Sequence, residues 1–207
     1  MTDTIENIEN ITFNDYGGKA DQFWDRTKDH DVSQNYDAFL APFAGKNGLD
    51  ILDLGCGPGR DVVYFKSLGH NPVGLDGTAE FCDMARDLTG CEILEQSFND
   101  LDLSDNRFDG IFANASLFHV PSSNLDKVLN DLHNALRPEG ILFMSNPRGD
   151  TEGWQGPGRY GNFMQFEESH AYLKKAGFEL VDHYYRPPNL PRAEQNWLAI
   201  VSRALKC

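Results

Sequence analysis

The sequence predicts a single α/β domain built around a mostly parallel sheet with helices on both faces. From Asp50 onward, short apolar runs that suit buried strands alternate with segments whose apolar residues recur at helical spacing. The chain has 207 residues, a length that suits one domain with a sizeable core. A third observation is the apolar run from Ile51 to Leu54, which leads straight into a glycine-rich loop and then a helix. That succession predicts a ligand cradle at the edge of the sheet.

The expected elements follow one another along the chain. Residues 1 to about 14 are polar and terminal, so we expect them to be loosely ordered. A helical segment is expected from about Lys19 to Leu40. Strands are predicted at 50–55, 72–76, 91–96, 108–114 and 140–146, and helices at about 59–69, 78–88, 124–136 and 166–176.

Two of these predictions have specific support. The helix after Ser123 carries one apolar stripe, with Pro138 and Gly140 to end it; the stripe consists of Leu125, Val128, Leu129, Leu132 and Leu136. The last two apolar runs, FELVDHYY and WLAIVSRAL, are joined by a proline-rich loop. They predict an antiparallel hairpin at the edge of the sheet.

Charge and cysteine content restrict the partners. The chain has 32 acidic and 18 basic side chains, a formal net charge of -14, and no cluster of basic residues. Such a field repels nucleic acid and anionic membranes, so neither is an expected partner. The four cysteines show no metal-binding spacing and indicate reduced thiols in a cytoplasmic protein; they are Cys56, Cys82, Cys91 and Cys207. The polar N-terminus does not have the pattern of a secretory signal.

The loop after the first strand has glycines at alternate positions, Gly55, Gly57 and Gly59. Glycine permits tight turns and a close approach of the main chain to a ligand. The spacing G-x-G-x-G departs from the dinucleotide fingerprint G-x-G-x-x-G, and Asp53 stands where that fingerprint stays apolar. Asp76 ends the next apolar run. A nicotinamide oxidoreductase is therefore disfavoured, and an ordinary glycine-rich turn is the remaining alternative.

The residues ILDLGCGPG, followed by GLD, resemble motif I of the class I S-adenosylmethionine (SAM)-dependent methyltransferases. The resemblance covers about Asp50 to Leu205. It implies a Rossmann-like, seven-stranded, mostly parallel sheet in the order 3-2-1-4-5-7-6 with the last strand antiparallel. It also implies a methyltransferase domain over 46–207, preceded by a helical segment over 1–45 that covers the cofactor.

The resemblance also implies which residues bind SAM. Asp53 would accept from the methionine ammonium, and Asp76 would accept both ribose hydroxyls. The glycine loop passes the methionyl and ribose portions, and Gly77 leaves room beside the adenosine. The positions that would flank adenine or methionine are Ser97, Phe98, Asn114 and Leu117. Phe98 is equally a core residue or a stacking partner.

An N-terminal pattern resembles a bacterial subgroup of small enzymes in the same family. Its members here are Tyr16, Ala20, Phe23, Arg26 and Thr27. Tyr16 and Arg26, together with Arg60 after the glycine loop, would contact the SAM carboxylate, because a guanidinium pairs strongly with a carboxylate. Arg26 can also be a solvated helix charge.

Two loops are expected to frame a methyl acceptor. The segment 146–163 is too long and rich in glycine for a plain connector, and we interpret it as a substrate loop, with a mobile surface loop as the alternative. The expected acceptor contacts are Arg148, Trp154, Arg159, Tyr160, Phe163, Tyr185 and Arg186. With Arg192 added, the arginines of this acidic chain favour a small, polar, anionic acceptor.

The predicted activity is in-line methyl transfer from SAM to a small molecule, by a monomer or homodimer without a metal. His119, Tyr160 and His183 are the candidate bases if one is needed, although His119 is favoured as a brace for its loop. A SAM-binding protein without transferase activity, such as a sensor, is the alternative. Neither the acceptor nor the atom that is methylated follows from these residues.

Overall fold

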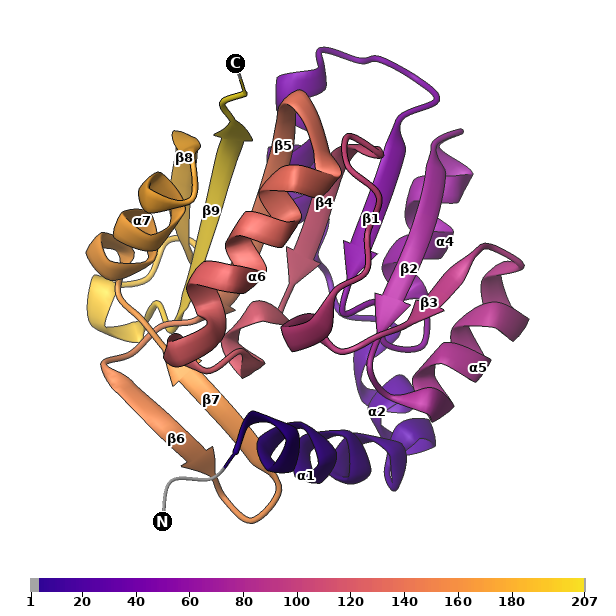
Figure 1. Ribbon diagram of the computed structural model, residues 1–207, viewed down its shortest axis with the longest axis vertical. Coiled ribbons are helices and arrows are strands. Elements are labelled where there is room, and N and C mark those ends of the chain that lie inside the picture. The colour runs from indigo at the N-terminus through magenta and orange to yellow at the C-terminus, as the bar shows by residue number, and fades with distance from the viewer. Residues whose placement is uncertain (1–3, 207) are drawn as a thin grey trace.

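The computed structural model describes residues 4–206 and consists of a seven-stranded sheet, a separate two-stranded hairpin and helices on both faces of the larger sheet (Figure 1). The helices are α1 (Ile5–Gly17), α2 (Ala20–Thr27), α3 (Ser33–Leu40), α4 (Arg60–Ser67), α5 (Ala79–Thr89), α6 (Ser122–Ala135) and α7 (Phe166–Lys175). The strands are β1 (Asp50–Leu54), β2 (Asn71–Asp76), β3 (Ile93–Glu95), β4 (Phe108–Asn114), β5 (Leu136–Pro147), β6 (Thr151–Gln155), β7 (Arg159–Phe163), β8 (Phe178–Arg186) and β9 (Trp197–Ala204). Short 3-10 turns lie at Ala41–Phe43, Phe98–Asp100, Leu117–His119 and Arg192–Glu194.

The large sheet has the order β3-β2-β1-β4-β5-β9-β8. Strands β1 to β5 are parallel, β9 runs antiparallel to β5, and β8 runs antiparallel to β9. Because β6 and β7 form their own hairpin, the seven strands of the large sheet, counted along the chain, have the predicted order 3-2-1-4-5-7-6. The predicted fold and the C-terminal hairpin are therefore confirmed.

The central strand β1 shows why this sheet forms. Ile51, Leu52 and Leu54 are fully buried, since β1 is flanked by β2 and β4 and covered on both faces. Ile51 faces a cluster with residues of α3 and α4, while Leu52 and Leu54 face a cluster with α6 and α7. Side chains of a strand alternate between faces, so a strand buried on both faces is a continuous apolar run. The polar exception is Asp53.

The N-terminal segment differs from the expectation. Residues 5–14 are not loosely ordered but belong to α1, whose start is capped by Thr4, with Oγ1 accepting from Asn7 N at 3.2 Å. Residues 1–3 lie outside the described part of the chain. The single helix expected from Lys19 to Leu40 is two helices, because Asp31 turns the chain between them by accepting from Ser33 N at 3.0 Å.

Two further boundaries were wrong. The segment expected to be a loop at 146–163 contains the β6–β7 hairpin, in which Trp154 pairs with Tyr160 and Gln155 with Arg159. Its short, glycine-containing strands lack the apolar alternation that marks a half-buried strand. Helix α6 ends at Ala135, and Leu136 begins β5 instead of ending the apolar stripe.

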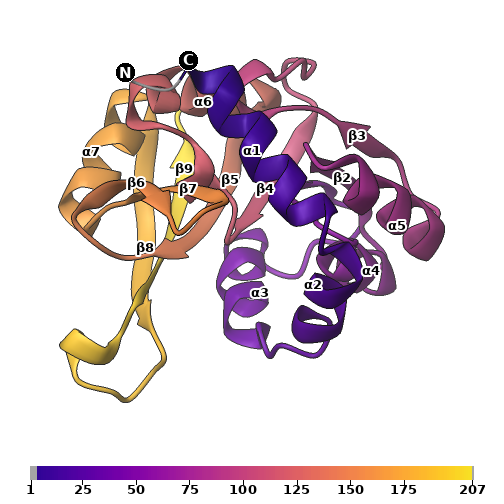
Figure 2. The same ribbon diagram turned by 90° about the horizontal axis from the view of Figure 1, so that it is seen from below.

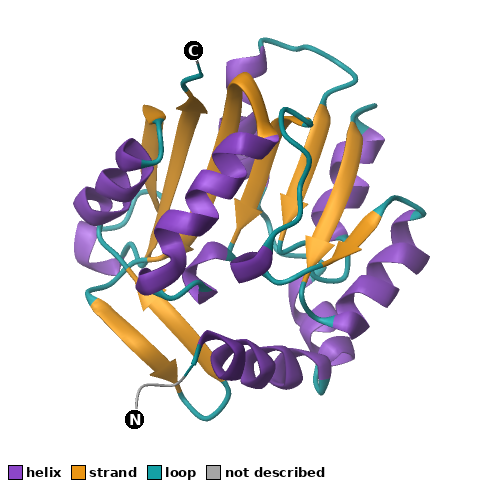
Figure 3. Cartoon of the chain, in the orientation of Figure 1, coloured by secondary structure: helices purple, strands orange, loops and turns teal. Residues whose placement is uncertain are grey.

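Helix α1 and the β6–β7 hairpin lie at the carboxyl ends of the parallel strands (Figure 3). Seen from that end, α1 crosses the sheet between the hairpin and α5 (Figure 2). Ligands of open α/β sheets bind at this edge. Within residues 4–206, no helix is long and apolar enough to cross a membrane.

Candidate active site

The glycine loop is tied to the end of β2. The amides of Gly55 and Cys56 both donate to Leu75 O, at 2.7 and 3.0 Å. Gly55 and Gly57 have φ values of 79° and 51°, in the left-handed region that favours glycine. The loop is thus folded back on the neighbouring strand before α4 begins at Arg60.

Asp76 holds this loop and faces a cavity. Its Oδ2 accepts from Gly57 N at 3.0 Å and its Oδ1 from Thr78 N at 2.8 Å. Burial raises the pKa of Asp76, while the hydrogen bonds from Thr78 and Gly57 oppose that rise. Both oxygens retain acceptor capacity, since a carboxylate has about four lone-pair positions.

Asp53 lies 1% exposed under the loop, and its Oδ2 accepts no hydrogen bond from residues 4–206. Burial, and then the negative charge of Asp61, raise the pKa of Asp53 well above its ordinary value. An orphaned buried carboxylate oxygen is costly without a partner. A cationic donor, such as the ammonium of an amino acid, is the kind of partner this oxygen lacks, although Asp53 itself lines neither of the two cavities at the glycine loop.

Two cavities meet at the glycine loop. The inner cavity, of about 80 Å³, lies between α1 and the ends of β2 and β3, and the outer chamber, of about 730 Å³, lies between α2, the end of β4 and the loop after β8. The inner cavity is lined by Ile8, Glu9, Thr12, Phe13, Tyr16, Phe23, Gly55, Gly57, Asp76, Gly77, Thr78, Phe81, Phe98, Asn99, Ala115, Ser116 and His119. The outer chamber shares Tyr16, Phe23, Gly55, Gly57 and Ala115 and adds Trp24, Thr27, His30, Asp31, Val32, Cys56, Pro58, Arg60, Asp61, Asn114, Phe118, Ser145, Pro147, Arg159, Arg186, Pro187, Pro188 and Trp197.

The inner cavity is small because α1 is pressed into it. The ring of Phe13 lies where a Cβ on Gly77 would stand. The volume has room for a few water molecules and is smaller than an adenosyl group. An adenosyl group therefore enters only if the half-buried Phe13 ring turns outward or α1 moves.

Tyr16 stands between the two cavities, braced by His119. His119 Nδ1 lies 2.7 Å from Tyr160 O, a carbonyl that can only accept, so Nδ1 carries the proton. Nε2 of the neutral ring therefore accepts from Tyr16 OH at 2.8 Å. Burial lowers the pKa of His119 to about 4. This geometry supports the bracing role for His119, and it leaves the ring without a free nitrogen to act as a base.

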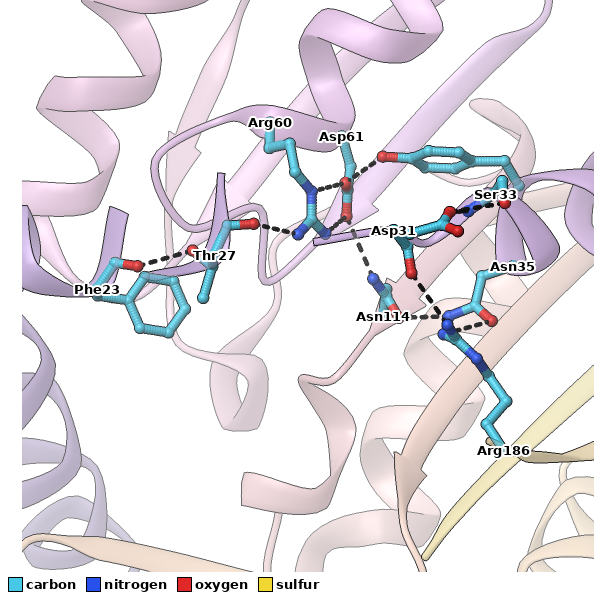
Figure 4. Close-up of polar contacts among 10 residues, drawn as sticks. Phe23, Thr27, Asp31, Ser33, Asn35, Arg60, Asp61, Asn114 and Arg186 are labelled. Carbon is cyan, nitrogen blue, oxygen red and sulfur yellow. Dashed lines mark hydrogen bonds and ion pairs between the residues drawn. The ribbon is translucent and has the colours of Figure 1, made fainter. Parts of the chain in front are cut away.

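The opposite wall of the outer chamber is a buried polar network (Figure 4). Asp61 accepts from Tyr36 OH at 2.5 Å and from Arg60 Nε and Nη2 at 2.6 and 2.9 Å. Although burial opposes it, the hydrogen bonds and charge of Asp61 raise the pKa of Arg60. Arg60 also donates to Thr27 O at 2.9 Å, so it ties α4 to the end of α2.

The network continues toward the loop after β8. Asn114 donates to Asp61 Oδ2 at 3.4 Å and accepts from Asn35 Nδ2 at 2.9 Å. Asn35 Oδ1 accepts from Tyr184 OH at 2.8 Å and from Arg186 Nη1 at 3.1 Å, and Arg186 Nη2 donates to Asp31 O at 3.0 Å. Hydrogen bonds thus connect α4, which begins at Arg60, to Arg186, which lies 126 positions later in the sequence.

The structure divides the predicted cofactor residues into three groups. Those lining the inner cavity are Tyr16, Gly55, Gly57, Asp76, Gly77 and Phe98, and those lining only the outer chamber are Arg60 and Asn114. Arg26, Asp53, Gly59, Ser97 and Leu117 line neither cavity. Arg26 is exposed, Leu117 is a core residue, and Gly59 has a φ of 98° and faces Ala85 and Thr89 of α5.

The predicted acceptor residues divide in the same way. Arg159 and Arg186 line the outer chamber, whereas Arg148, Trp154, Tyr160, Phe163 and Tyr185 do not. Arg148 braces a loop by donating to Gln195 O at 3.1 Å and Arg192 O at 2.7 Å, and Arg192 stacks on Tyr185. Tyr160 OH donates to Glu152 Oε1 at 2.9 Å, away from both cavities. The sequence did not single out Trp24, Phe118 and Trp197 as chamber walls or Glu9 and Phe13 as cavity walls, since isolated aromatics and acids carry no spacing signal.

Comparisons with known proteins agree with this geometry. A family model described as a methyltransferase domain matches residues 52–144. An uncharacterised methyltransferase of Schizosaccharomyces pombe is 30% identical over 125 residues, which cover 56% of this chain and 86% of that protein. The malonyl-[acyl-carrier protein] O-methyltransferase of Pectobacterium atrosepticum is 32% identical over 104 residues, covering 50% of this chain and 40% of that protein.

Among solved structures, the Burkholderia thailandensis 1,6-didemethyltoxoflavin-N1-methyltransferase, with bound 1,6-didemethyltoxoflavin and S-adenosylhomocysteine, superposes with a TM-score of 0.81. It is 24% identical, and the match covers 100% of this chain and 92% of that one. The chain spans less than half the length of the first curated relatives it matches, with 40%, 45% and 48% of them covered.

A seven-stranded sheet in this order, with a glycine loop after its first strand, defines a class of Rossmann-like domains. Within that class, the relatives named above are methyltransferases. The chain belongs to the class I S-adenosylmethionine-dependent methyltransferase family.

Proposed function

We propose that this protein transfers the methyl group of S-adenosylmethionine to a small, flat, anionic molecule bound in the outer chamber. The observation that carries the proposal is the shared wall: Tyr16, Gly55 and Gly57 line both cavities. A cofactor lying along the glycine loop would therefore expose its reactive group to a molecule in the chamber.

On the cofactor side, each residue has a specific task. Asp76 accepts hydrogen bonds from the ribose diol while it anchors Gly57, and Asp53 accepts from the methionine ammonium, directly or through water. Arg60, which is paired with Asp61, lines the chamber side of the loop and faces the methionine carboxylate of the cofactor. The helical segment before β1, part of residues 1–45, covers the cofactor. When bound, S-adenosylmethionine supplies a methyl group that is already electrophilic.

On the acceptor side, the chamber favours a flat molecule. Trp24, Phe118 and Trp197 supply three aromatic walls, and Pro147, Pro187 and Pro188 add rigid apolar surface. The flat heterocycle named for the Burkholderia enzyme supports the same reading. The strongly negative net charge of the chain favours a small molecule over a nucleic acid.

The two chamber arginines favour an anion. Arg186 donates to two neutral oxygens and forms no ion pair within residues 4–206, although its charge acts on the nearby Asp31 carboxylate, so it lines the chamber without a directly paired anion. Arg159 is paired with Asp15 at 2.8 Å and stacks on the Tyr16 ring at 4.1 Å. An acceptor that arrives already ionised needs no general base, and such a base is not available from His119.

Catalysis then consists of positioning. The aromatic walls and Arg186 orient the acceptor atom toward the glycine loop, and α1 and α2 exclude water from the junction of the cavities. Tyr16, fixed by His119, defines that junction.

Calorimetric titration with S-adenosylhomocysteine tests the cofactor part, with one site of micromolar-range affinity expected and NAD as the negative control. For the acceptor part, the protein is incubated with S-adenosylmethionine and a panel of flat acids and heterocycles with ionisable N–H or O–H groups. Acceptor-dependent formation of S-adenosylhomocysteine is measured by mass spectrometry. Binding without turnover on any anionic, neutral or cationic member of the panel would favour the alternative, a SAM-binding protein without transferase activity.

A further inference from the structure

We propose that Glu9 of α1 recognises the 6-amino group of the adenine, so that the helix covering the cofactor also selects its base. The inference rests on the proposed function, because it assumes that an adenosyl group occupies the inner cavity. It assigns a role to a residue outside the glycine loop and outside the strand ends.

Glu9 lies on the face of α1 that points into the inner cavity. Glu9, Thr12, Phe13 and Tyr16 all line that cavity, and their spacing of three, four and seven positions puts them on one helix face. Glu6, one turn earlier, is exposed. The position of Glu9 on the helix therefore directs its side chain toward the inner cavity.

The Glu9 carboxylate is held by fixed donors past the end of β3. Its Oε1 accepts from Ser97 Oγ and from Asn99 Nδ2, the latter at 2.6 Å. Asn99 is itself oriented, because its Oδ1 accepts from Asn124 Nδ2 at 2.7 Å. One oxygen thus takes both donors.

The second oxygen, Oε2, accepts no hydrogen bond from residues 4–206. An ionised carboxylate can only accept, so whatever meets Oε2 must be a donor. Ile8 and Phe98, which line the same cavity, are apolar and suit the faces of a flat ring.

The position along the cavity matches a base rather than a sugar. Asp76 ends β2 and suits the ribose, and β3 lies beside β2, with Gln96 N donating to Asp76 O at 3.1 Å. Ser97 and Asn99 follow the end of β3, on the side of Asp76 away from the central strand β1, and they hold the Glu9 carboxylate there. A purine attached to a ribose at Asp76 reaches this corner, and its exocyclic amine is the donor that Oε2 lacks.

The test compares two ligands that differ at one position of the base. S-adenosylhomocysteine has a 6-amino group, a donor, and S-inosylhomocysteine has a 6-oxo group, an acceptor. Calorimetry should show that the unaltered protein binds the adenine ligand at least about tenfold more tightly, as for one well-placed hydrogen bond to a charged group.

In Glu9→Gln the amide oxygen keeps the donors Ser97 and Asn99, which turns the amide N–H toward the ring. The ratio of the two dissociation constants should therefore fall about tenfold or more, with the adenine ligand weakened and the inosine ligand retained or strengthened. Glu6→Gln makes the same charge change on the exposed side of α1, and its ratio should equal that of the unaltered protein. Thermal melting confirms that both variants are folded.

An unchanged ratio in a folded Glu9→Gln, with both ligands weakened equally, would show that Glu9 only latches α1 and would overturn the inference while the proposed function stands. If the unaltered protein binds neither ligand, the proposed function fails, and the inference fails with it.

Discussion

The inner cavity and the outer chamber use the same end of the same sheet in different ways. Apart from α1 and Phe23, the inner cavity is built from residues 55–119, the strand ends and loops that follow β1 to β4. The outer chamber draws on residues from Tyr16 to Trp197, so nearly the whole chain must fold before its walls exist. The inner cavity is small and covered by a helix, whereas the chamber is large and walled by aromatics and arginines.

The difference shows how one fold can keep the binding site of a common cofactor and vary the binding site of a second ligand. Parallel strands bring their carboxyl ends to one edge, so a few short loops suffice for the shared cofactor. The chamber depends on α2, the turn after β4 and the loop after β8, where insertions and substitutions leave the sheet intact.

The comparison predicts its largest effect at Asp76. Asp76→Ala removes the acceptor for the ribose diol and the anchor of Gly57, and should weaken S-adenosylhomocysteine binding by about 1–3 kcal/mol, roughly 5- to 150-fold. Calorimetry measures the change. Asp87→Ala, which removes an exposed carboxylate from α5, should bind like the unaltered protein. Unaltered affinity in Asp76→Ala would remove the ribose from this corner of the inner cavity.

Asp53 should affect binding and stability in opposite directions. Asp53→Asn removes an uncompensated buried charge, so the free energy of unfolding at neutral pH should rise by about 1–3 kcal/mol while affinity for S-adenosylhomocysteine falls. Because the folded pKa of Asp53 lies above its unfolded value, the native state holds this proton more tightly. The stability of the unaltered protein relative to Asp53→Asn is therefore greatest at low pH and is lost as the pH rises from about 4 through the folded pKa.

Urea unfolding of both proteins at about pH 4.5 and about pH 8, toward the two ends of that pH range, measures this difference. A gap between the two proteins that does not depend on pH would show that Asp53 keeps an ordinary pKa. A stability gain without loss of ligand affinity would separate Asp53 from the cofactor.

Phe13 tests the difference between the inner cavity, which α1 covers, and the outer chamber. Phe13→Ala removes the ring that lies over Gly77 and should speed and tighten S-adenosylhomocysteine binding, roughly two- to fivefold, because the competent state is more populated. Stopped-flow fluorescence gives the association rate. Trp197→Ala, which removes a wall of the outer chamber alone, should leave that rate unchanged. Slower or weaker binding in Phe13→Ala would mean that the ring contacts the ligand instead of blocking it.

The smallest effect concerns the brace between the cavities. The pKa of His119 is lowered to about 4 by burial, so between pH 4 and about 6.5 the unfolded chain binds a proton that the native state does not. Unfolding free energy should therefore fall as the pH drops through this range. His119→Gln should reduce that slope, measured by urea unfolding at several pH values, whereas His30→Gln at an exposed position should keep it. Equal slopes for all three proteins would show that His119 titrates normally.

The sheet and its glycine loop could be predicted from the order of residues alone. Ile51, Leu52 and Leu54 give β1 apolar residues on both of its faces, and Gly55 and Gly57 adopt the left-handed conformations of the loop. Strand, loop and helix therefore follow from neighbouring residues alone. The family resemblance of the same stretch predicted Asp53 and Asp76 as cofactor residues; Asp76 lines the inner cavity, whereas Asp53 lies under the loop and lines neither cavity.

The elements that close the two cavities depend on contacts between distant parts of the chain. The N-terminal residues are polar, and α1 is stable because Ile8, Thr12 and Phe13 meet the end of the sheet and Asp15 meets Arg159 of the distant hairpin. Arg148 follows the end of β5 and Arg186 ends β8, yet the first braces a loop and the second lines the chamber. Local spacing records which residues are neighbours along the chain, whereas the direction of these side chains depends on partners 44 to 151 positions away.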